Sequence, residues 1–235
     1  MKAKNLLLTL AVGAMVMGCN NGSINQTSAP LKTAADSASF YLGYINGKGM
    51  QQMGMKDMNM SAFVAGMNSA KQDKKVETSQ EAMEMFLNSY FQKLFMQKAQ
   101  ENAEKGEKFL KENAKKSGVD TLADGIQYKV IKQGNGAKPT ETDVVKVNYK
   151  GTLIDGTEFD SSYKRGEPAQ FQLNYVIPGW TKAIKEMPVG SKWEIYIPSD
   201  QAYGQRGNNA IGPNETLIFE VELLDIVKPE TPAKK

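Results

Sequence analysis

The sequence predicts an α+β protein, in which an all-α segment is followed by an antiparallel β-sheet wrapped on a short α-helix. Two observations carry this prediction. No proline occurs from Ala34 to Gly118, and strong helix formers dominate that stretch. After Gly118 the apolar residues recur at every second position, which is typical of half-buried strands. The 235 residues are enough for two modest domains.

The all-α segment contains three expected helices. Ser39–Met53 and Ser61–Ala70 are two short stretches in which apolar residues alternate with small ones. The third helix begins at Thr78-Ser79-Gln80-Glu81, a sequence that matches a capping box with Thr78 as the cap. We expect it to continue to Lys116, just before a glycine that is a natural stop.

The two halves of the long expected helix differ in polarity. Apolar side chains in its first half recur at three- and four-residue spacing, which predicts a buried stripe. The second half, residues 97–116, is nearly all polar, and we expect it to be an exposed strut. The residues that precede the helix are too few to bury the stripe, so a homodimer through residues 34–95 is the economical arrangement. A monomeric three-helix bundle is the alternative. The stripe consists of Met83, Phe86, Leu87, Tyr90, Phe91, Leu94 and Phe95.

Four segments after Gly118 alternate between apolar and polar residues, and we expect about five antiparallel strands. Asp155-Gly156 is a tight-turn signal between two of them. The apolar residues of Trp180–Met187 have the 0, 3, 4, 7 spacing of one helical face, which predicts the short helix of the sheet domain. The alternating segments are Ile126–Val130, Val145–Tyr149, Trp193–Ile197 and Leu217–Leu223.

The residue types exclude several classes of chemistry. The chain has no histidine, which removes Ser-His-Asp and Cys-His nucleophile systems and zinc sites built on imidazole. A single cysteine excludes disulfide frameworks within one chain. The formal charge is +3, of which Lys2 and Lys4 belong to a segment that we expect to be removed, so no net positive field favours nucleic acid. We therefore expect no cofactor, no metal and no nucleic-acid partner.

The N-terminus has the layout of a secretory signal. Met1–Lys4 carries two positive charges, and Leu6–Met17 is an apolar run too short to span a bilayer comfortably. The sequence Val16-Met17-Gly18-Cys19 then resembles the lipobox of bacterial lipoproteins. This resemblance implies a signal peptide over residues 1–18 and lipidation of Cys19. An ordinary secretory signal followed by an incidental cysteine is the alternative.

Residues 119–228 carry five motifs whose order and spacing resemble those of the FKBP domain, which implies a peptidyl-prolyl cis–trans isomerase. Residues 34–118 resemble the N-terminal dimerisation domain of the Mip/FkpA-like (macrophage infectivity potentiator) family, whose members are dimeric envelope isomerases. Residues 19–33 are then a flexible tether and residues 229–235 a polar tail. The five motifs are Val147-Asn148-Tyr149-Lys150-Gly151, Gly156–Ser162, Val176–Trp180, Ala202-Tyr203-Gly204 and Leu217–Leu223.

The same resemblance implies a proline pocket made of aromatic and apolar side chains. Trp180 would form its floor, the Ile177 amide would hold a substrate carbonyl, and Tyr203 would donate a hydrogen bond from the rim. Asp160 would lie beside the twisting carbonyl, oriented by Arg165 and Tyr149. The resemblance implies as catalytic residues Asp160, Tyr203, Trp180, Phe159, Tyr149 and Ile177, and as substrate-binding residues Arg165, Phe171, Val176, Ile211, Phe219 and Tyr175.

Two positions depart from the family pattern. Tyr175 occupies a lip position where relatives usually carry a smaller or polar residue, and Ala169 replaces an aromatic residue that some relatives have. Both changes alter the rim of the pocket and leave its floor intact. The preference for the residue before proline is therefore open.

The implied function is isomerisation of X-Pro bonds in unfolded or nascent envelope proteins, by a dimer that also acts as a chaperone. The implied location is the outer membrane, with the lipid-anchored protein facing the periplasm. Macrolide inhibitors such as tacrolimus are implied ligands. The alternative is a non-catalytic chaperone that uses the same groove only to hold peptides.

Overall fold

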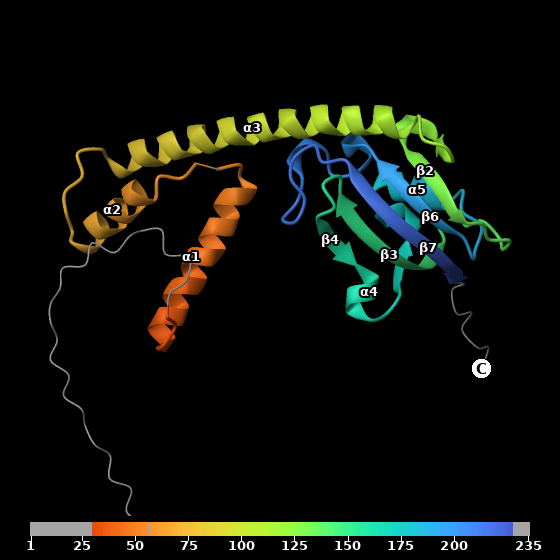
Figure 1. Ribbon diagram of the computed structural model, residues 1–235, viewed down its shortest axis with the longest axis horizontal. Coiled ribbons are helices and arrows are strands. Elements are labelled where there is room, and N and C mark those ends of the chain that lie inside the picture. The colour runs from red at the N-terminus through yellow and green to blue at the C-terminus, as the bar shows by residue number, and fades with distance from the viewer. Residues whose placement is uncertain (1–29, 56, 228–235) are drawn as a thin grey trace, which may run out of the picture. The chain divides into compact units, whose positions relative to one another are not determined.

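The structure is a computed structural model that describes residues 30–55 and 57–227 (Figure 1). The expected signal peptide, the lipobox-like Cys19, residues 19–29 of the tether and the polar tail lie outside the described residues. Their predicted roles therefore stay predictions. No helix in the two described ranges is long and apolar enough to cross a membrane.

The predicted α+β class is confirmed, with helices first and an antiparallel sheet after them (Figure 1). The described chain divides into two compact units. One holds residues 30–45 and 57–75, and the other holds residues 46–55 and 76–227. The long helix and the whole sheet belong to the second unit.

Within the described residues, three helices precede the sheet. They are α1 (Ala34–Gln52), α2 (Met60–Lys71) and α3 (Gln80–Asn113). The cap of α3 is Ser79 rather than the expected Thr78, because the Ser79 hydroxyl accepts a hydrogen bond from the Ala82 amide at 3.2 Å. The helix ends at Asn113, three residues before the predicted Lys116, and has 34 residues.

The second half of α3 is not the exposed strut expected from its polarity. The Asn113 side chain is fully buried, and its amide donates to Oε1 of Gln127 at 3.0 Å. The ring of Phe109 packs against Tyr196, with the two ring centroids 5.9 Å apart. The side-chain donors of Asn102 and Asn113 find acceptors in the sheet domain, although the buried Oδ1 of Asn113 has no partner within the described residues. Polarity alone therefore did not predict that one side of this half is buried. The buried residues of α3 are Ala99, Asn102, Gly106 and Asn113.

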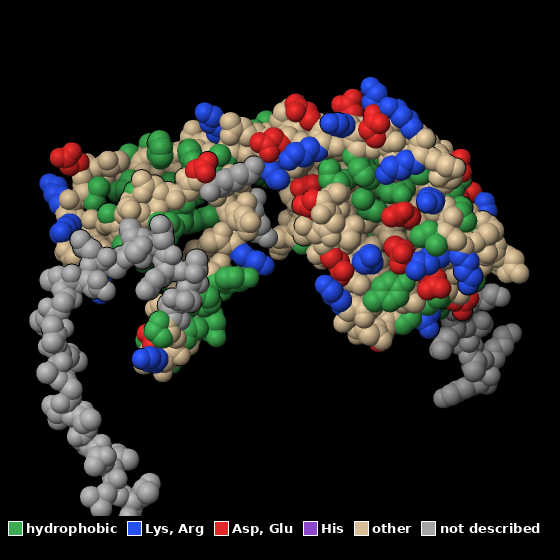
Figure 2. All heavy atoms as spheres, viewed as in Figure 1, with side chains coloured by type: hydrophobic (Ala, Val, Ile, Leu, Met, Phe, Trp, Pro, Cys, Tyr) green, Lys and Arg blue, Asp and Glu red, His purple; other side chains and the backbone are tan. Residues whose placement is uncertain are grey.

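The apolar first half of α3 is instead exposed in the single chain. Phe86 is 69% exposed and Leu87 is 45% exposed. Helix α1 likewise exposes Leu42 and Ile45. Figure 2 shows hydrophobic side chains at the surface of these two helices. The expected stripe is therefore a large apolar surface in the described part of one chain.

In the part of the chain that the structure describes, seven strands form one antiparallel sheet. They are β1 (Val119–Thr121), β2 (Gln127–Lys132), β3 (Val144–Leu153), β4 (Glu158–Ser161), β5 (Ala169–Gln172), β6 (Lys192–Ile197) and β7 (Leu217–Val227). The strand order is β1-β2-β6-β7-β3-β4, and β5 also pairs with β3. Strands β3 and β7 pair along their length, from Val144 opposite Val227 to Leu153 opposite Leu217. Strands β1 and β5 were not predicted, because three and four residues are too few to show an alternation.

The core lies between the sheet and the short helix α5 (Pro178–Ile184). The predicted apolar face of this segment is confirmed, since Trp180 is 4% exposed and Ile184 and Met187 are fully buried. Along β7, every second side chain from Leu217 to Leu223 is buried in the same core. The remaining elements are α4 (Ser162–Arg165) and the 3₁₀ turns Ala123–Gly125, Leu173–Tyr175, Ser199–Gln201 and Gly204–Arg206.

Candidate functional site

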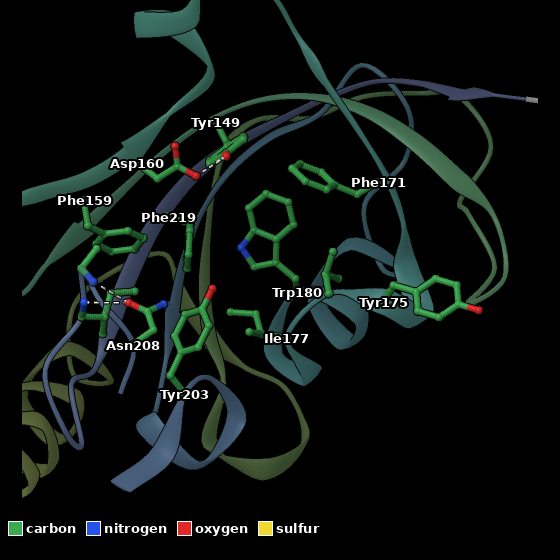
Figure 3. A pocket seen from close by; sticks show the side chains of 13 residues that line it. Tyr149, Phe159, Asp160, Phe171, Tyr175, Ile177, Trp180, Tyr203, Asn208 and Phe219 are labelled. Carbon is green, nitrogen blue, oxygen red and sulfur yellow. Dashed lines mark hydrogen bonds between the residues drawn. The ribbon is translucent and has the colours of Figure 1, made fainter. Parts of the chain in front are cut away.

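A pocket of about 580 Å³ opens in the sheet domain, over the start of α5 (Figure 3). Its walls come from β3, β4, β5, α5 and β7, and from the loops that connect them. Most of the lining side chains are aromatic or aliphatic. The pocket is lined by Tyr149, Phe159, Asp160, Phe171, Tyr175, Val176, Ile177, Trp180, Tyr203, Asn208, Ala210, Ile211 and Phe219.

Trp180 forms the floor of this pocket. The centroid of its ring lies 5.1 Å from that of Tyr149, 5.2 Å from Phe219 and 5.4 Å from Phe171, each in an edge-to-face arrangement. Edge-to-face pairs add to the stability gained by burying the rings, so the floor is rigid as well as apolar. The buried Nε1 of Trp180 has no hydrogen-bond partner in the part of the chain that the structure describes.

A glycine in β3 makes room for two of the aromatic walls. A Cβ atom on Gly151 would lie 2.6 Å from the Phe159 ring and 2.8 Å from the Phe219 ring. The two rings meet edge to face over this glycine, with centroids 5.5 Å apart. A larger residue at this position would push both rings into the cavity.

Asp160 brings a charge to the rim of the apolar pocket. Its position follows from the β3–β4 pairing, in which it lies opposite Gly151. The hydroxyl of Tyr149 donates a short hydrogen bond to its Oδ2, and Nη1 of Arg165 lies 2.5 Å from its Oδ1. Nη2 of Arg165 also donates to the Tyr149 hydroxyl at 2.7 Å. The carboxylate is therefore held in one orientation from two sides.

These contacts also decide the protonation states. Burial opposes ionisation of Asp160, but the hydrogen bonds from Tyr149 and Arg165 outweigh burial and hold the pKa of the carboxyl below its ordinary value. Burial, and then the hydrogen bond to Asp160, raise the pKa of Tyr149. At neutral pH the rim therefore presents a carboxylate beside a neutral phenol.

Two tyrosines at the rim point in different directions. Figure 3 shows the Tyr203 hydroxyl directed into the cavity and the Tyr175 ring turned away from it. Tyr175 is 81% exposed and Tyr203 is 40% exposed. Burial and the nearby charge of Asp160 raise the pKa of Tyr203, so its hydroxyl stays a hydrogen-bond donor at neutral pH.

Ile177 lies directly before α5 and presents backbone as well as side chain to the pocket. Its carbonyl accepts hydrogen bonds from the amides of Trp180 at 2.9 Å and Thr181 at 3.2 Å. Its own N–H has no acceptor within the described residues. This amide is therefore available to a ligand carbonyl, as the resemblance implies.

Asn208 and Ala210 line one wall of the pocket and were not predicted, whereas Ile211 of the same loop was. The side-chain Oδ1 of Asn208 accepts hydrogen bonds from the backbone amides of Ala210 and Ile211, both at 2.8 Å (Figure 3). The backbone amide of Asn208 donates to the Ile211 carbonyl. These bonds close the loop that begins at Gly207, whose φ of +61° favours glycine. The sequence signal was an asparagine next to that glycine, which is typical of a side-chain-closed turn.

The predicted site residues thus lie together, with one exception. Twelve residues were expected at the pocket, and eleven of them line it. The exception is Arg165, which lies behind Asp160 and orients it. Ala169 is half-buried in β5 and packs against the core. The roles assigned to these residues remain predictions.

Both halves of the chain match known families. Residues 135–224 match the family described as FKBP-type peptidyl-prolyl cis-trans isomerase. Residues 35–130 match the family described as the domain amino terminal to FKBP-type peptidyl-prolyl isomerase.

Full-length relatives extend this similarity over almost the whole chain. The Outer membrane protein MIP of Legionella longbeachae is 42% identical over 233 residues, which cover 96% of this chain and 99% of that protein. The FKBP-type 22 kDa peptidyl-prolyl cis-trans isomerase of Escherichia coli K12 is 44% identical over 205 residues, covering 86% of this chain and 100% of that protein. The crystal structure of FkpA from Escherichia coli is similar with a TM-score of 0.63 at 37% identity, over 86% of this chain and 100% of that chain.

We expect Arg165→Met to raise the pKa of Asp160, because the variant removes one of the two groups that stabilise the carboxylate. The charged carboxylate stabilises the fold above the unfolded-state pKa of about 3.9. That contribution is lost as the pH falls through the lower folded-state pKa. Titration of the Asp160 carboxyl carbon by NMR measures the shift. Arg206→Met removes the other arginine and is the control, and an unchanged midpoint in Arg165→Met would contradict the prediction.

Proposed function

Since the chain belongs to the FKBP-type peptidyl-prolyl cis-trans isomerase family and is a peptidyl-prolyl isomerase, we propose that it rotates X-Pro bonds in the pocket floored by Trp180. The observation that carries this proposal is the combination of a buried aromatic floor with one oriented carboxylate at the rim. The reaction forms no covalent intermediate, so the lack of histidine is no obstacle.

The pocket acts on an amide whose rotation is opposed by resonance. The barrier of about 18–20 kcal/mol comes from the double-bond character of the C–N bond. The planar amide is more polar than the twisted amide, because twisting localises the lone pair on nitrogen. A dry aromatic floor under the proline ring therefore destabilises the planar state relative to the twisted one. This is preferential binding of the transition state.

The polar groups at the rim add to this preference. In the planar amide the carbonyl oxygen carries more negative charge than in the twisted amide. A fixed carboxylate at Asp160 repels that charge and so favours the twisted state. The Ile177 amide and the Tyr203 hydroxyl hold the neighbouring substrate carbonyls in place while the bond rotates. Macrolide inhibitors such as tacrolimus would occupy the same pocket.

A homodimer through residues 34–95 is the proposed assembly. The apolar surface of α1 and of the first half of α3 supports it, because a single soluble chain rarely leaves so much apolar surface uncovered. We assign residues 34–118 to dimerisation and residues 119–228 to isomerisation. Two linked pockets can engage one unfolded client at several prolines, which supports chaperone activity on whole proteins.

A place in the cell envelope is supported by the relative named Outer membrane protein MIP. We propose that residues 1–18 direct secretion and that lipidation of Cys19 anchors the chain to the outer membrane, facing the periplasm. The clients would then be unfolded or nascent envelope proteins. The lipobox-like sequence before Cys19 supports this proposal.

We expect Asp160→Asn and Tyr203→Phe each to lower kcat/KM on a short X-Pro peptide by about tenfold, which corresponds to about 1.4 kcal/mol of transition-state stabilisation. The matched controls are Asp120→Asn and Tyr163→Phe, which change the same groups outside the pocket. If both folded pocket variants keep the wild-type kcat/KM, the pocket assignment is wrong. If tacrolimus still binds the wild type but no turnover is found, the protein is the non-catalytic chaperone.

We expect Phe86→Glu to convert the dimer into a monomer, because it places a charge on the exposed apolar stripe of α3. Activity on short peptides should persist, whereas the refolding of large proline-limited clients should slow, since avidity contributes about 10²–10⁴ to binding. Gln92→Glu adds the same charge to the same helix away from the stripe and is the control. Light scattering measures the mass. A monomeric wild-type protein would overturn the proposed assembly.

We expect Cys19→Ala to move the protein from the membrane fraction to the soluble envelope fraction, because a diacylated cysteine is the proposed anchor. Fractionation followed by a high-salt wash measures this. A variant that stays with the membrane after the wash would argue against a lipid anchor at this residue.

A further inference from the structure

The second half of α3 is hydrogen-bonded to residues 213–215, the segment that leads into β7. Asn102 is 3% exposed, and its Nδ2 donates to the Pro213 carbonyl and to Oε1 of Glu215, both at 2.8 Å. In return, Nδ2 of Asn214 donates to the carbonyl of Ala99 in the helix at 3.2 Å. Three consecutive residues of the segment are thus bonded to one turn of α3.

The helix backbone also packs directly on this segment. A Cβ atom on Gly106 would overlap Oγ1 of Thr216 and lie 3.3 Å from its Cβ. Thr216 is itself buried, immediately before β7. Only a glycine in α3 permits this approach, so the sequence of the helix is adapted to this contact.

The same segment forms a wall of the pocket at its other end. Asn208, Ala210 and Ile211 line the cavity. The Asn214 amide donates to the Gly204 carbonyl at 2.9 Å, which closes the segment into a loop. Only Gly212 separates the pocket residues from those bonded to α3. Figure 1 shows this loop beneath the second half of α3.

We propose that Asn102 is a positioning residue for the isomerase pocket, which from α3 fixes the loop that carries Asn208, Ala210 and Ile211. The long helix then belongs to the enzyme's binding site as its outer support. This inference rests on the proposed pocket and extends it to a residue with no contact to substrate. A displaced loop changes the wall of the pocket and leaves its floor intact, so binding and X-Pro selectivity should change more than the turnover step.

Asn102 works as a donor to two acceptors, one of which is a carboxylate. Burial raises the pKa of Glu215, which is faced by Lys98 and Lys105 from α3, by Asp155 from the β3–β4 turn and by Asn102 itself. The Asn102 amide donates to this carboxyl group and to the Pro213 carbonyl in a partly buried place, so two hydrogen bonds from one side chain hold the loop.

The first experiment compares Asn102→Ala with Asn88→Ala in the full chain. Both variants replace an asparagine within α3, so the change in helix propensity is the same, but Asn88 is exposed. For Asn102→Ala we expect KM on short X-Pro peptides to rise by about tenfold with a smaller change in kcat, and the ranking of X residues to change. Asn88→Ala should match the wild type in both.

The second experiment separates positioning from loss of folding. Asn102→Asp replaces a donor by a second carboxylate next to Glu215, and two adjacent carboxylates share one proton as the pH falls. As the pH is lowered from about 8 to about 5, the two carboxylates take up this proton and their repulsion falls. We therefore expect the ratio of variant to wild-type kcat/KM, measured by NMR exchange, to rise over that range. Adding Glu215→Gln restores the hydrogen bond between these two positions with its direction reversed, but it leaves the Pro213 carbonyl without its donor. The double variant should therefore lose this pH dependence and recover part of the activity at the higher pH.

The outcomes distinguish the inference from the proposed function. If Asp160→Asn and Tyr203→Phe lower activity while folded Asn102 variants keep wild-type KM, ranking and pH profile, the positioning role is wrong and the pocket stands. If neither pocket variant has an effect, the pocket itself is wrong and the inference fails with it. A change in KM and ranking in Asn102→Ala, together with a pH dependence in Asn102→Asp that the double variant removes, supports the positioning role.

Discussion

The pocket depends on one packing arrangement, in which the indole of Trp180 fills the concave face of the sheet. Its ring meets three other aromatic rings edge to face, and these come from β3, β5 and β7. The helix that carries it is only seven residues long and has little stability of its own. Burial against the sheet holds the helix, and the helix in turn presents the Ile177 amide at the mouth of the pocket. The same contacts that form the core therefore form the floor of the site.

Polarity is segregated within this site. The floor offers a proline ring no charge, whereas the carboxylate of Asp160 stands at the rim with its own hydrogen-bonding network. Desolvation of a lone carboxylate would raise its pKa and neutralise it, and the network prevents this. In the proposed reaction, a polar planar amide would meet a dry surface on one side and a like charge on the other. Both conditions would disfavour the ground state more than the twisted state.

The fold could be predicted wherever a segment was long enough to display its period. The buried face of Trp180–Met187 and the alternation along β7 could be predicted for that reason, whereas the three-residue β1 could not. The site could be predicted because the chain resembles one family, and that resemblance implied Ile211 of the pocket loop. Asn208 and Ala210 of the same loop were missed because their place in the wall depends on how the loop closes. The burial of Asn102 could not be predicted, because its hydrogen-bond partners lie more than 100 residues away in the sequence. Without those partners, a polar side chain on a helix is expected to be exposed.

The four buried residues of α3, at positions 99, 102, 106 and 113, fall on one side of the helix and pack on the sheet domain. The apolar stripe over residues 83–95 belongs to the same continuous helix. Each residue of an α-helix turns the chain by about 100°, so the helix fixes an angular phase between the two surfaces. A single insertion between them would rotate the stripe by more than a quarter turn relative to the docked loop. Changes in the length of this helix are therefore tolerable only in steps close to whole turns, such as about seven or eleven residues.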